Sequence, residues 1–250
     1  MHSAEQKQQA KQYWLPYHHI PRIVDGNFTQ TFDFFWGHKY LHLLEFIQNT
    51  VKEQTYSSHM DFGCGDGRLL TYMYAAQSEC RAVGIDMDSR AITYAKLLSS
   101  DSIEFICQDV MTCTETFDVI TAIEVFEHIP PDILPGIIDF LYSRLNPGGR
   151  LIFTVPSTNL PLSKKHYQHF NEQLLHKYFS HINLQKTGWL CSTGRRDRFL
   201  QKMLSNRFFL LNNKTLLNLI YKIYGKLLLQ SNSATGQHVW GCCLKGNSNI

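Results

Sequence analysis

The sequence predicts an α/β protein with a doubly wound, mostly parallel sheet of seven strands and a helical insertion before the last strand. Two observations predict this class. From about residue 58 to about residue 156, short apolar runs alternate with stretches of helical periodicity, which is the order of a parallel sheet covered by helices on both faces. In addition, a glycine-rich turn at residues 61–67 joins the first of these strands to a helix. A chain of 250 residues is long enough for one such domain with additions.

The chain before the sheet divides into an arm and a helix. We expect residues 1–36 to form an N-terminal arm, which either covers a ligand pocket or packs on the domain surface. Pro16 and Pro21 rule out a continuous helix in its aromatic and histidine-rich part. Between Phe32 and Lys52, apolar residues at near-helical spacing predict a helix that packs on the sheet.

The glycine-rich turn reads DFGCGDG and predicts a ligand-binding loop. Glycine adopts positive φ without steric cost and has no Cβ, so three alternating glycines let the backbone bend sharply and lie against a ligand. The third glycine, Gly67, stands one residue earlier than the third glycine of a dinucleotide-binding fingerprint. The turn is therefore related to that fingerprint but distinct from it.

Polar residues follow the next two predicted strands. Arg81–Asp86 is a short buried strand pattern that ends in a carboxylate, about 20 residues after the loop. An acid at this place in a nucleoside-binding fold accepts hydrogen bonds from ribose hydroxyls, and we expect Asp86 to have this role. A third strand pattern ends before Gln108–Val110, and helical stretches at about 67–77 and 88–99 separate the three strands.

Four more strand patterns and one helix complete the predicted sheet. In the helix, Ile133, Ile137 and Leu141 recur every four residues, so one apolar stripe faces the sheet. We expect the last two strands to form an antiparallel hairpin at the sheet edge. The predicted elements are strands at 117–120, 145–153, 182–190 and 237–244 and a helix at 132–145.

Four motifs in this order resemble those of the class I S-adenosylmethionine (SAM)-dependent methyltransferases: the D-x-G-x-G-x-G turn, the acid Asp86, the pair Asp109–Val110, and L-x-P-G-G-x-L over residues 145–151. The resemblance implies a Rossmann-like methyltransferase fold, methyltransferase activity and SAM as the cofactor. It also implies that the glycines cradle the methionine part of SAM, the acid before them orients its amino group, the next acid takes the ribose hydroxyls and the pair holds the adenine. The cofactor-binding residues implied in this way are Asp61, Gly63, Cys64, Gly65, Gly67, Asp86, Met87, Asp109, Val110 and Glu124.

Acids and imidazoles cluster after the fourth and fifth strands. Glu124, Glu127 and His128 share one face if this stretch forms a helical turn. His166 and His169 follow the fifth strand, and the carboxyl ends of strands are where open α/β sheets bind ligands, so both groups suit one site. An alcohol or phenol that accepts a methyl group must lose a proton, which requires a base or a metal beside that group. His128, Glu124 and His169 are therefore the candidate catalytic residues.

The E-x-x-E-H spacing of this cluster resembles two kinds of methyltransferase. In small-RNA 3′-terminal 2′-O-methyltransferases, two glutamates and two histidines hold a divalent ion, and a similar motif occurs in ubiquinone-biosynthesis O-methyltransferases. By that match the metal ligands are Glu124, Glu127, His128 and His169, a mixed oxygen and imidazole set that suits Mg²⁺, Mn²⁺, Fe²⁺ or Zn²⁺. The alternative is that His128 alone acts as the base, while Glu124 lines the pocket and Glu127 caps the next helix.

A basic helical insertion precedes the last strand. The organisation that we expect is an arm at 1–36, a SAM-binding core at 37–190, the insertion at 191–234, and the last strand with a tail at 235–250. From Cys191 to Gln230 the chain has eight basic residues and one acid, so this stretch carries a formal charge of +7 and the rest carries −4. We interpret residues 195–230 as a lid or cap, a contact with an anionic membrane surface, or a site for an anionic ligand such as RNA.

Composition favours a globular protein in the cytoplasm. Seven cysteines without a C-x-x-C pair indicate reduced thiols, no apolar run approaches about 18 residues, and the polar N-terminus lacks the apolar core of a secretory signal. The sequence therefore predicts a cytoplasmic SAM-dependent methyltransferase that acts on an oxygen of a small-molecule acceptor. Two alternatives stay open: a metal-dependent RNA ribose 2′-O-methyltransferase, and a non-catalytic SAM-binding or membrane-surface protein.

Overall fold

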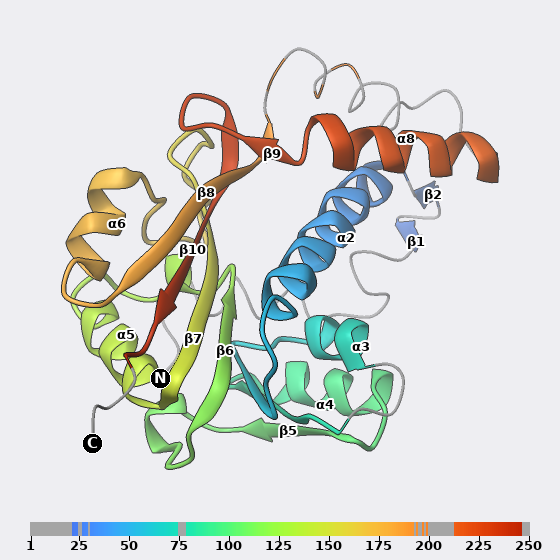
Figure 1. Cartoon of the computed structure of the whole chain (residues 1–250). Coiled ribbons are helices and arrows are strands. Elements are labelled where there is room, and N and C mark those ends of the chain that lie inside the picture. Colours follow the sequence, from blue (N-terminus) through green and yellow to red (C-terminus); the bar gives the residue numbers. More distant parts are fainter. Residues whose placement is uncertain are drawn as a thin grey trace.

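The structure is a computed structural model that describes residues 22–24, 27–29, 31–74, 79–192, 194, 197, 199 and 213–246. Figure 1 shows a central sheet flanked by helices, with helix α8 (Lys214–Leu227) along one side of the molecule. Most of the predicted N-terminal arm lies outside the described residues. Within it, β1 (Arg22–Val24) and β2 (Asn27–Thr29) form a separate antiparallel pair. Helix α2 (Thr31–Val51) confirms the helix predicted before the sheet.

The central sheet has eight strands in the order β5-β4-β3-β6-β7-β10-β8-β9. Strands β3 to β7 pair in parallel, whereas β10 runs antiparallel to both β7 and β8, and β9 runs antiparallel to β8. The predicted fold class is confirmed, with β9 as an additional strand of two residues. The last two predicted strands do pair, but β10 lies inside the sheet rather than at its edge. The strands are β3 (Ser58–Phe62), β4 (Arg81–Asp86), β5 (Ile103–Cys107), β6 (Phe117–Ile123), β7 (Leu145–Pro156), β8 (Leu184–Ser192), β9 (Gln230–Ser231) and β10 (Gly236–Leu244).

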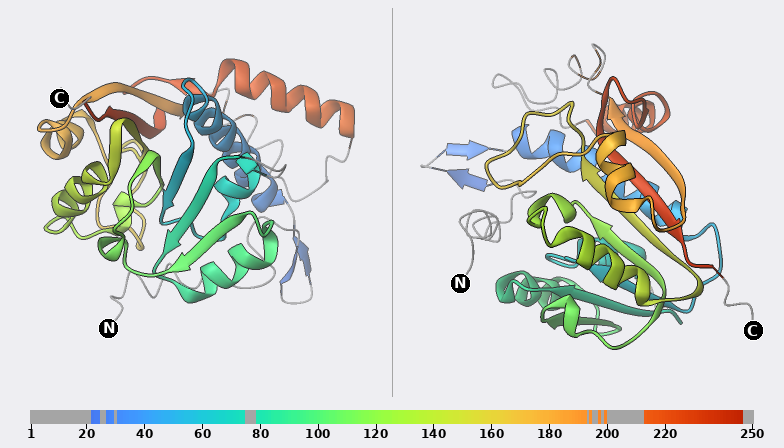
Figure 2. Two further views of the ribbon diagram at one scale, coloured as in Figure 1. Left: turned by 60° about the horizontal axis from the view of Figure 1, so that its bottom comes forward. Right: turned by 90° about the vertical axis from the view of Figure 1, so that its left-hand side faces the viewer.

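Helices cover both faces of the sheet (Figure 2). Ile138 of α5 shares the largest core cluster with Ile120 of β6, whereas Ile47 of α2 shares another cluster with Val119 of the same strand. Because neighbouring residues of a strand point to opposite faces, these two clusters lie on opposite sides of the sheet. The remaining helices are α3 (Arg68–Tyr74), α4 (Ser89–Leu98), α5 (Leu134–Ser143) and α6 (Glu172–Phe179), with short 3-10 helices η1 (Val110–Thr112) and η2 (Phe126–His128).

Helix α6 was not predicted from the sequence, whereas α3, α4 and α5 confirm predicted helices. Asn171 caps α6, because its side chain accepts a hydrogen bond from the N–H of Leu174.

No helix among the described residues has both the length and the apolar character needed to cross a bilayer.

Asp118 ties three segments together at the amino end of the sheet. Its Oδ2 accepts hydrogen bonds from the N–H groups of Ser57 and Ser58 and from the Ser57 hydroxyl at 2.7 to 3.0 Å, and its Oδ1 accepts one from the Asn146 amide at 2.7 Å. Burial alone would raise the pKa of Asp118, but these hydrogen bonds hold it well below its usual range. A carboxylate of this kind adds stability above its unfolded-state pKa, and that stability is lost as the pH falls through the folded-state pKa.

We expect Asp118→Ala to lower the free energy of unfolding by about 1–3 kcal/mol at neutral pH, because it leaves several donors without an acceptor. The loss should shrink as the pH falls below about 4, where the unfolded carboxyl is already protonated. Urea unfolding at several pH values measures both effects. The control is Asp139→Ala, which removes an exposed carboxylate that pairs with His181 and should cost about 0–1 kcal/mol. Equal losses in the two variants would contradict the role of Asp118.

Candidate active site

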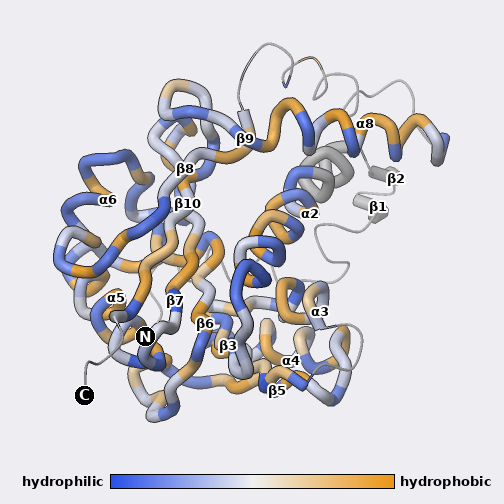
Figure 3. The backbone as a smooth tube through the Cα atoms, in the orientation of Figure 1, coloured by the Kyte–Doolittle hydropathy of each residue, from blue (hydrophilic) through white to orange (hydrophobic). Residues whose placement is uncertain are grey.

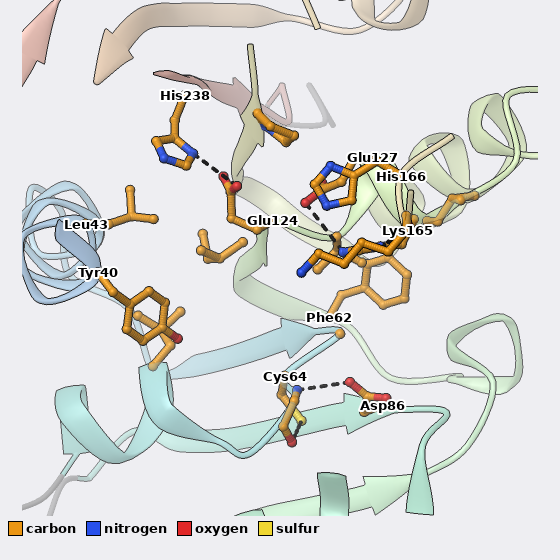
Figure 4. A pocket seen from close by; sticks show the side chains of 18 of the residues that line it. Tyr40, Leu43, Phe62, Cys64, Asp86, Glu124, Glu127, Lys165, His166 and His238 are labelled. Carbon is orange, nitrogen blue, oxygen red and sulfur yellow. Dashed lines mark hydrogen bonds and ion pairs between the residues drawn. The ribbon is translucent and has the colours of Figure 1, made fainter. Parts of the chain in front are cut away.

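A cavity of about 580 Å³ opens at the carboxyl ends of β3, β4, β6 and β7. Its walls come from the glycine-rich turn, from Tyr40 and Leu43 of α2, from the segments that follow β6 and β7, and from β10 (Figure 4). This is the edge at which open α/β sheets bind ligands, and the volume lies in the range of small-molecule sites. The cavity is therefore the candidate active site.

The glycine-rich turn forms one wall in the backbone conformation that its sequence predicts. Gly63, Gly65 and Gly67 have φ angles of 68°, 56° and 73°, which most other residues adopt only with strain. A Cβ added to Gly63 would lie 2.7 Å from Val125, and one added to Gly67 would lie 2.5 Å from the ring of Phe105. Gly63 and Gly65 line the cavity, whereas Gly67 allows close packing beneath it.

Asp86, at the end of β4, holds this turn in place. Its Oδ2 accepts a hydrogen bond from the N–H of Gly65 at 3.0 Å, and its Oδ1 accepts one from the N–H of Asp88 at 2.8 Å. Burial raises the pKa of Asp86, and the two N–H groups oppose this rise. Cys64 packs tightly against β4, because a Cβ added to Gly84 of that strand would lie 2.9 Å from the Cys64 sulfur. The small Cys64 side chain thus fits between the turn and β4.

Asp61 of β3 is buried at the base of the cavity and belongs to a chain of polar groups. The Thr121 hydroxyl donates to Asp61 Oδ1 at 2.6 Å, Nε2 of His59 lies 2.9 Å from that hydroxyl, and Nδ1 of His59 lies 2.8 Å from the Tyr74 hydroxyl. Since Thr121 gives its only proton to Asp61, His59 donates to Thr121 from Nε2. Burial raises the pKa of Asp61 to about 7; Thr121 opposes this rise, and Asp86 adds to it. The carboxyl is therefore partly neutral at neutral pH.

Glu124 follows β6 directly and has a strained backbone. Its φ is 56°, and among the described residues only Cys191 shares a positive φ without being glycine; both line the cavity. Such strain concentrates at functional sites. Glu124 Oε2 lies 3.0 Å from Nδ1 of His238 on β10, as Figure 4 shows. Burial favours the neutral acid, but the adjacent His238, as an imidazolium when protonated and as a hydrogen-bond donor, outweighs it and, with Thr154, lowers the pKa of Glu124.

Three imidazoles beyond Glu124 have defined proton positions. Burial lowers the pKa of each, so all three are neutral at pH 7. Nδ1 of His128 lies 2.9 Å from the Lys165 carbonyl oxygen, and Nδ1 of His169 lies 3.1 Å from the Leu160 carbonyl oxygen. A carbonyl only accepts, so both Nδ1 atoms carry protons, and His169 Nε2 accepts the Nδ1–H of His166 at 2.8 Å. His128 and His166 each keep an Nε2 lone pair.

Glu127, His128 and His166 form a compact group, called here the acid–imidazole group. One potential ligand atom from each residue lies within 4.8 Å of the other two, and Glu127 Oε1 is 3.7 Å from His128 Nε2. Glu127 is 1% exposed, and its Oε2 has no hydrogen-bond partner in the part of the chain that the structure describes. Burial, and then the charge of Glu124, raise the pKa of Glu127. Burial lowers the pKa of His128 to about 4 and that of His166 to about 3.

The structure groups these residues differently from the expected metal set. The sequence argument placed Glu124 on one face with the rest of the E-x-x-E-H motif by assuming a helical turn. The backbone at Glu124 is instead left-handed and the 3-10 helix begins only at Phe126, so the Glu124 side chain pairs with His238. His169 differs from the expected set too, because neither of its ring nitrogens is left for a metal. Its Nδ1 lies 3.1 Å from the Leu160 carbonyl oxygen, and its Nε2 lies 2.8 Å from Nδ1 of His166. Glu127 lines the cavity, and no side chain caps α5.

The residues expected to hold the nucleoside lie at the other end of the cavity. Met87 lines its rim and is 55% exposed, and Gln108 also lines it. The carboxylate of Asp109 accepts a hydrogen bond from the N–H of Met111 at 2.9 Å and caps η1. Val110 is 2% exposed and belongs to the core. Gln108 is thus better placed than Asp109 to offer a side chain to a ligand.

Sequence reasoning missed several polar residues of the cavity, among them His238, Lys165 and Lys39. Burial lowers the pKa of Lys165, and the neighbouring glutamates oppose this effect. Lys39 Nζ lies 3.2 Å from Asp197 Oδ2. Lys165 precedes the histidine pair and could have been included with it. His238 carries no local signal, because its contact with Glu124 depends on the position of β10 between two distant strands.

The fold and the site together define a class I SAM-dependent methyltransferase. The parallel strands, the glycine-rich turn after β3, the acid at the end of β4 and the antiparallel β10 all occur in the order that this class requires. Residues 35–194 match the methyltransferase domain family, and the chain belongs to that family. The predicted family and fold are confirmed.

Curated relatives match part of the chain rather than the whole of it. A ubiquinone biosynthesis O-methyltransferase of Idiomarina loihiensis is 28% identical over 124 residues, which cover 47% of this chain and 49% of the relative. One of Actinobacillus pleuropneumoniae serotype 5b is 32% identical over 128 residues, which cover 47% of this chain and 53% of the relative. The chain thus spans about half the length of the curated relatives that it matches.

Solved structures confirm the fold over a larger part of the chain. The N-methyltransferase NodS of Bradyrhizobium japonicum WM9 has a TM-score of 0.57 at 15% identity and covers 84% of this chain and 98% of its own. Coclaurine N-methyltransferase, bound to N-methylheliamine and S-adenosylhomocysteine (SAH), has a TM-score of 0.56 at 16% identity and covers 82% of this chain and 72% of its own. At this identity the similarity establishes the fold alone.

We expect the affinity for SAH to rise with pH up to about 7. Below its pKa of about 7, Asp61 is neutral and offers no charge to the ammonium of the ligand, so affinity should fall by up to about tenfold per pH unit. Isothermal titration calorimetry at several pH values measures this slope. Asp61→Asn should bind SAH more weakly and with a flat pH profile, whereas the remote Asp139→Asn should keep the slope. An unchanged slope in Asp61→Asn would assign the titration to another group.

Proposed function

We propose that the chain transfers the methyl group of SAM to a hydroxyl oxygen of a small-molecule acceptor. The observation that carries this proposal is the Glu124–His238 pair, which lines the same cavity as the glycine-rich turn. An amine acceptor needs little beyond alignment, whereas an alcohol or phenol must lose a proton. A carboxylate bound to an imidazole is an arrangement that performs such proton transfer.

The cofactor would occupy the acidic end of the cavity. In this proposal Gly63 and Gly65 contact the methionine part of SAM, and Asp61 pairs with its ammonium group. Asp86 has two carboxylate oxygens that each accept one backbone hydrogen bond and retain capacity for a ribose hydroxyl. Gln108 and Met87 would flank the adenine. Two acids at this end also suit the positive sulfonium of SAM, because nearby carboxylates stabilise a cation.

The proton would leave through His238. In the neutral tautomer of His238 with its proton on Nδ1, which lies 3.0 Å from Glu124 Oε2, Nε2 has a lone pair that takes a proton from the acceptor hydroxyl, and the ionised Glu124 then stabilises the imidazolium. The acceptor oxygen then attacks the methyl carbon in line with the departing sulfur, the carbon–sulfur bond breaks, and its electron pair stays on sulfur to give SAH. His128, the base expected from the sequence, is less suited to this role, since burial lowers its pKa to about 4.

The class of acceptor follows from the relatives and from the cavity. The matched curated relatives are named as O-methyltransferases of ubiquinone biosynthesis, which supports a hydroxyl on an aromatic ring as the acceptor. Tyr40 and Leu43 of α2 and Ile123 of β6 line the cavity and supply aromatic and apolar contact for such a ring. We therefore propose phenols or catechols as the first compounds to assay.

We expect labelled SAM to methylate members of a panel of catechols and phenols and not the matched anilines. Glu124→Gln and His238→Asn should lower kcat by about 10²–10⁴-fold for weakly acidic phenols, because proton removal is lost, and His238→Asn should leave SAH affinity unchanged. Acidic nitrophenols, which are already ionised at the assay pH, should react with the variants at near the wild-type rate. Equal losses for acidic and weakly acidic phenols would contradict a role of this pair as the base.

A divalent cation is a second part of the proposal. The acid–imidazole group fits one: Glu127 Oε2 lacks a partner among the described residues, and His128 and His166 present Nε2 lone pairs. The ligand atoms lie within 4.8 Å of one another, and two atoms that each lie about 2.1 Å from one ion are at most about 4.2 Å apart, so small side-chain shifts would let all three residues contact one ion. His169 and the Lys165 carbonyl would orient the two rings from behind. A bound cation would supply Lewis-acid stabilisation of an acceptor oxygen.

Two imidazoles and one carboxylate suit Mn²⁺, Fe²⁺ or Zn²⁺ better than Mg²⁺, which prefers oxygen ligands. We expect Mn²⁺ to bind the metal-free protein in calorimetry, EDTA to abolish methyl transfer, and Mn²⁺ to restore it. Glu127→Gln and His166→Asn should abolish Mn²⁺ binding, and His169→Asn should weaken it by about 10–100-fold. Glu124→Gln should retain binding, because that side chain faces His238. Full turnover in EDTA would reject the metal.

Three further predictions from the sequence concern RNA as the acceptor, a non-catalytic role and the cytoplasmic location. Five of the eight basic residues of the insertion lie outside the described residues, and no observation favours RNA as the acceptor. A non-catalytic role is disfavoured, since the cavity keeps both the cofactor-facing and the acceptor-facing polar groups. All seven cysteines are free thiols, in line with the cytoplasmic location that we propose.

A further inference from the structure

Helix α8 exposes an apolar stripe to solvent. Leu216, Leu219, Ile223 and Leu227 are 41%, 52%, 42% and 53% exposed. Residues at i, i+3, i+7 and i+11 lie on one side of a helix, so these four form a continuous stripe. In the described part of the chain, no other helix exposes more than two large apolar side chains. The stripe lies at the periphery of the molecule, where Figure 3 shows α8 away from the sheet.

The stripe is not needed to attach α8 to the domain. A different face of the helix is buried, with Ile220 and Leu228 each 6% exposed and Tyr224 fully buried. The ring of Tyr221 stacks on His42 of α2 with their centroids 3.8 Å apart. The helix therefore has one face that packs on α2 and a second apolar face directed to solvent.

Positive charge borders the stripe. Lys222 and Lys226 are exposed, and each follows a stripe residue, Leu219 or Ile223, by three positions, so both lie along one flank. The sequence of α8 contains no acid. A helix with exposed leucines beside lysines is suited to the boundary of a lipid bilayer, where apolar side chains enter the acyl region and ammonium groups reach the phosphates.

We propose that α8 docks the protein on the surface of an anionic lipid bilayer, with the stripe in the membrane boundary and Lys222 and Lys226 at the headgroups. The helix has 14 residues, so it would lie in the plane of the surface rather than cross it. A second copy of the chain is a poorer occupant, because an antiparallel two-fold contact through the stripe would bring the lysines of both copies together, and in any two-fold contact α8 of the second copy has no acid to pair with them. This proposal stands independently of the proposed methyl acceptor.

The experiment is cosedimentation of the full-length protein with vesicles of phosphatidylcholine alone or mixed equally with phosphatidylglycerol. Wild-type protein should bind the mixed vesicles, and high salt should weaken binding. Leu219→Gln with Ile223→Gln should reduce the partition coefficient about tenfold or more, and Lys222→Gln with Lys226→Gln should reduce it about fivefold for each lysine. Thermal unfolding and SAH binding check that each variant is folded.

A matched control comes from α4, which carries two exposed leucines beside an exposed lysine. Leu97→Gln with Leu98→Gln, and separately Lys96→Gln, should bind mixed vesicles like the wild type. Absence of binding by the wild type, or an equal loss in the α4 and α8 variants, would overturn the proposal. A concentration-dependent dimer that the α8 variants abolish, in a protein that ignores vesicles, would assign the stripe to a second copy instead.

Discussion

The hydrogen bond from the Gly65 N–H to the Asp86 carboxylate is the contact on which the site depends. It joins the turn after β3 to the end of β4, and the same carboxylate accepts the N–H of Asp88, the cap of α4. The turn needs such an anchor, because its three glycines have great conformational freedom in the unfolded chain. Fixing them at positive φ costs entropy, and this hydrogen bond helps to offset that cost. With the turn fixed, the cavity has a rigid floor against which a ligand can be aligned.

The cavity has two chemically different ends. Asp61 and Asp86, with raised pKa values, form an end that gains from a bound cation, whereas the neutral rings of His128 and His166 form an end that gains from a Lewis acid or a proton donor. Glu124 lies between them and keeps its charge through His238. A positively charged methyl donor would match the end with the two acids, and an acceptor that carries a hydroxyl group would match the end with the imidazoles.

The fold and the cofactor end were predictable from the sequence because their signals are local. Alternating strand and helix patterns and the three glycines at 63, 65 and 67 each specify geometry within a few residues. The acceptor end was predicted only in part, since its groups come from distant segments. The helical spacing assumed for Glu124 failed at one left-handed residue, and no local pattern places His238 beside it. The interior position of β10 likewise depends on pairing with two strands at once.

The interior position of β10 has a consequence for how the molecule is made. Strand β8 precedes β10 in the chain but is joined to β7 only through β10, so β8 and β9 can pair with each other but cannot enter the central sheet before β10 does. The same late strand delivers His238 to Glu124. The cofactor end of the cavity is therefore built from strands that pair without β10, whereas the Glu124–His238 contact forms only once β10 has paired with β7.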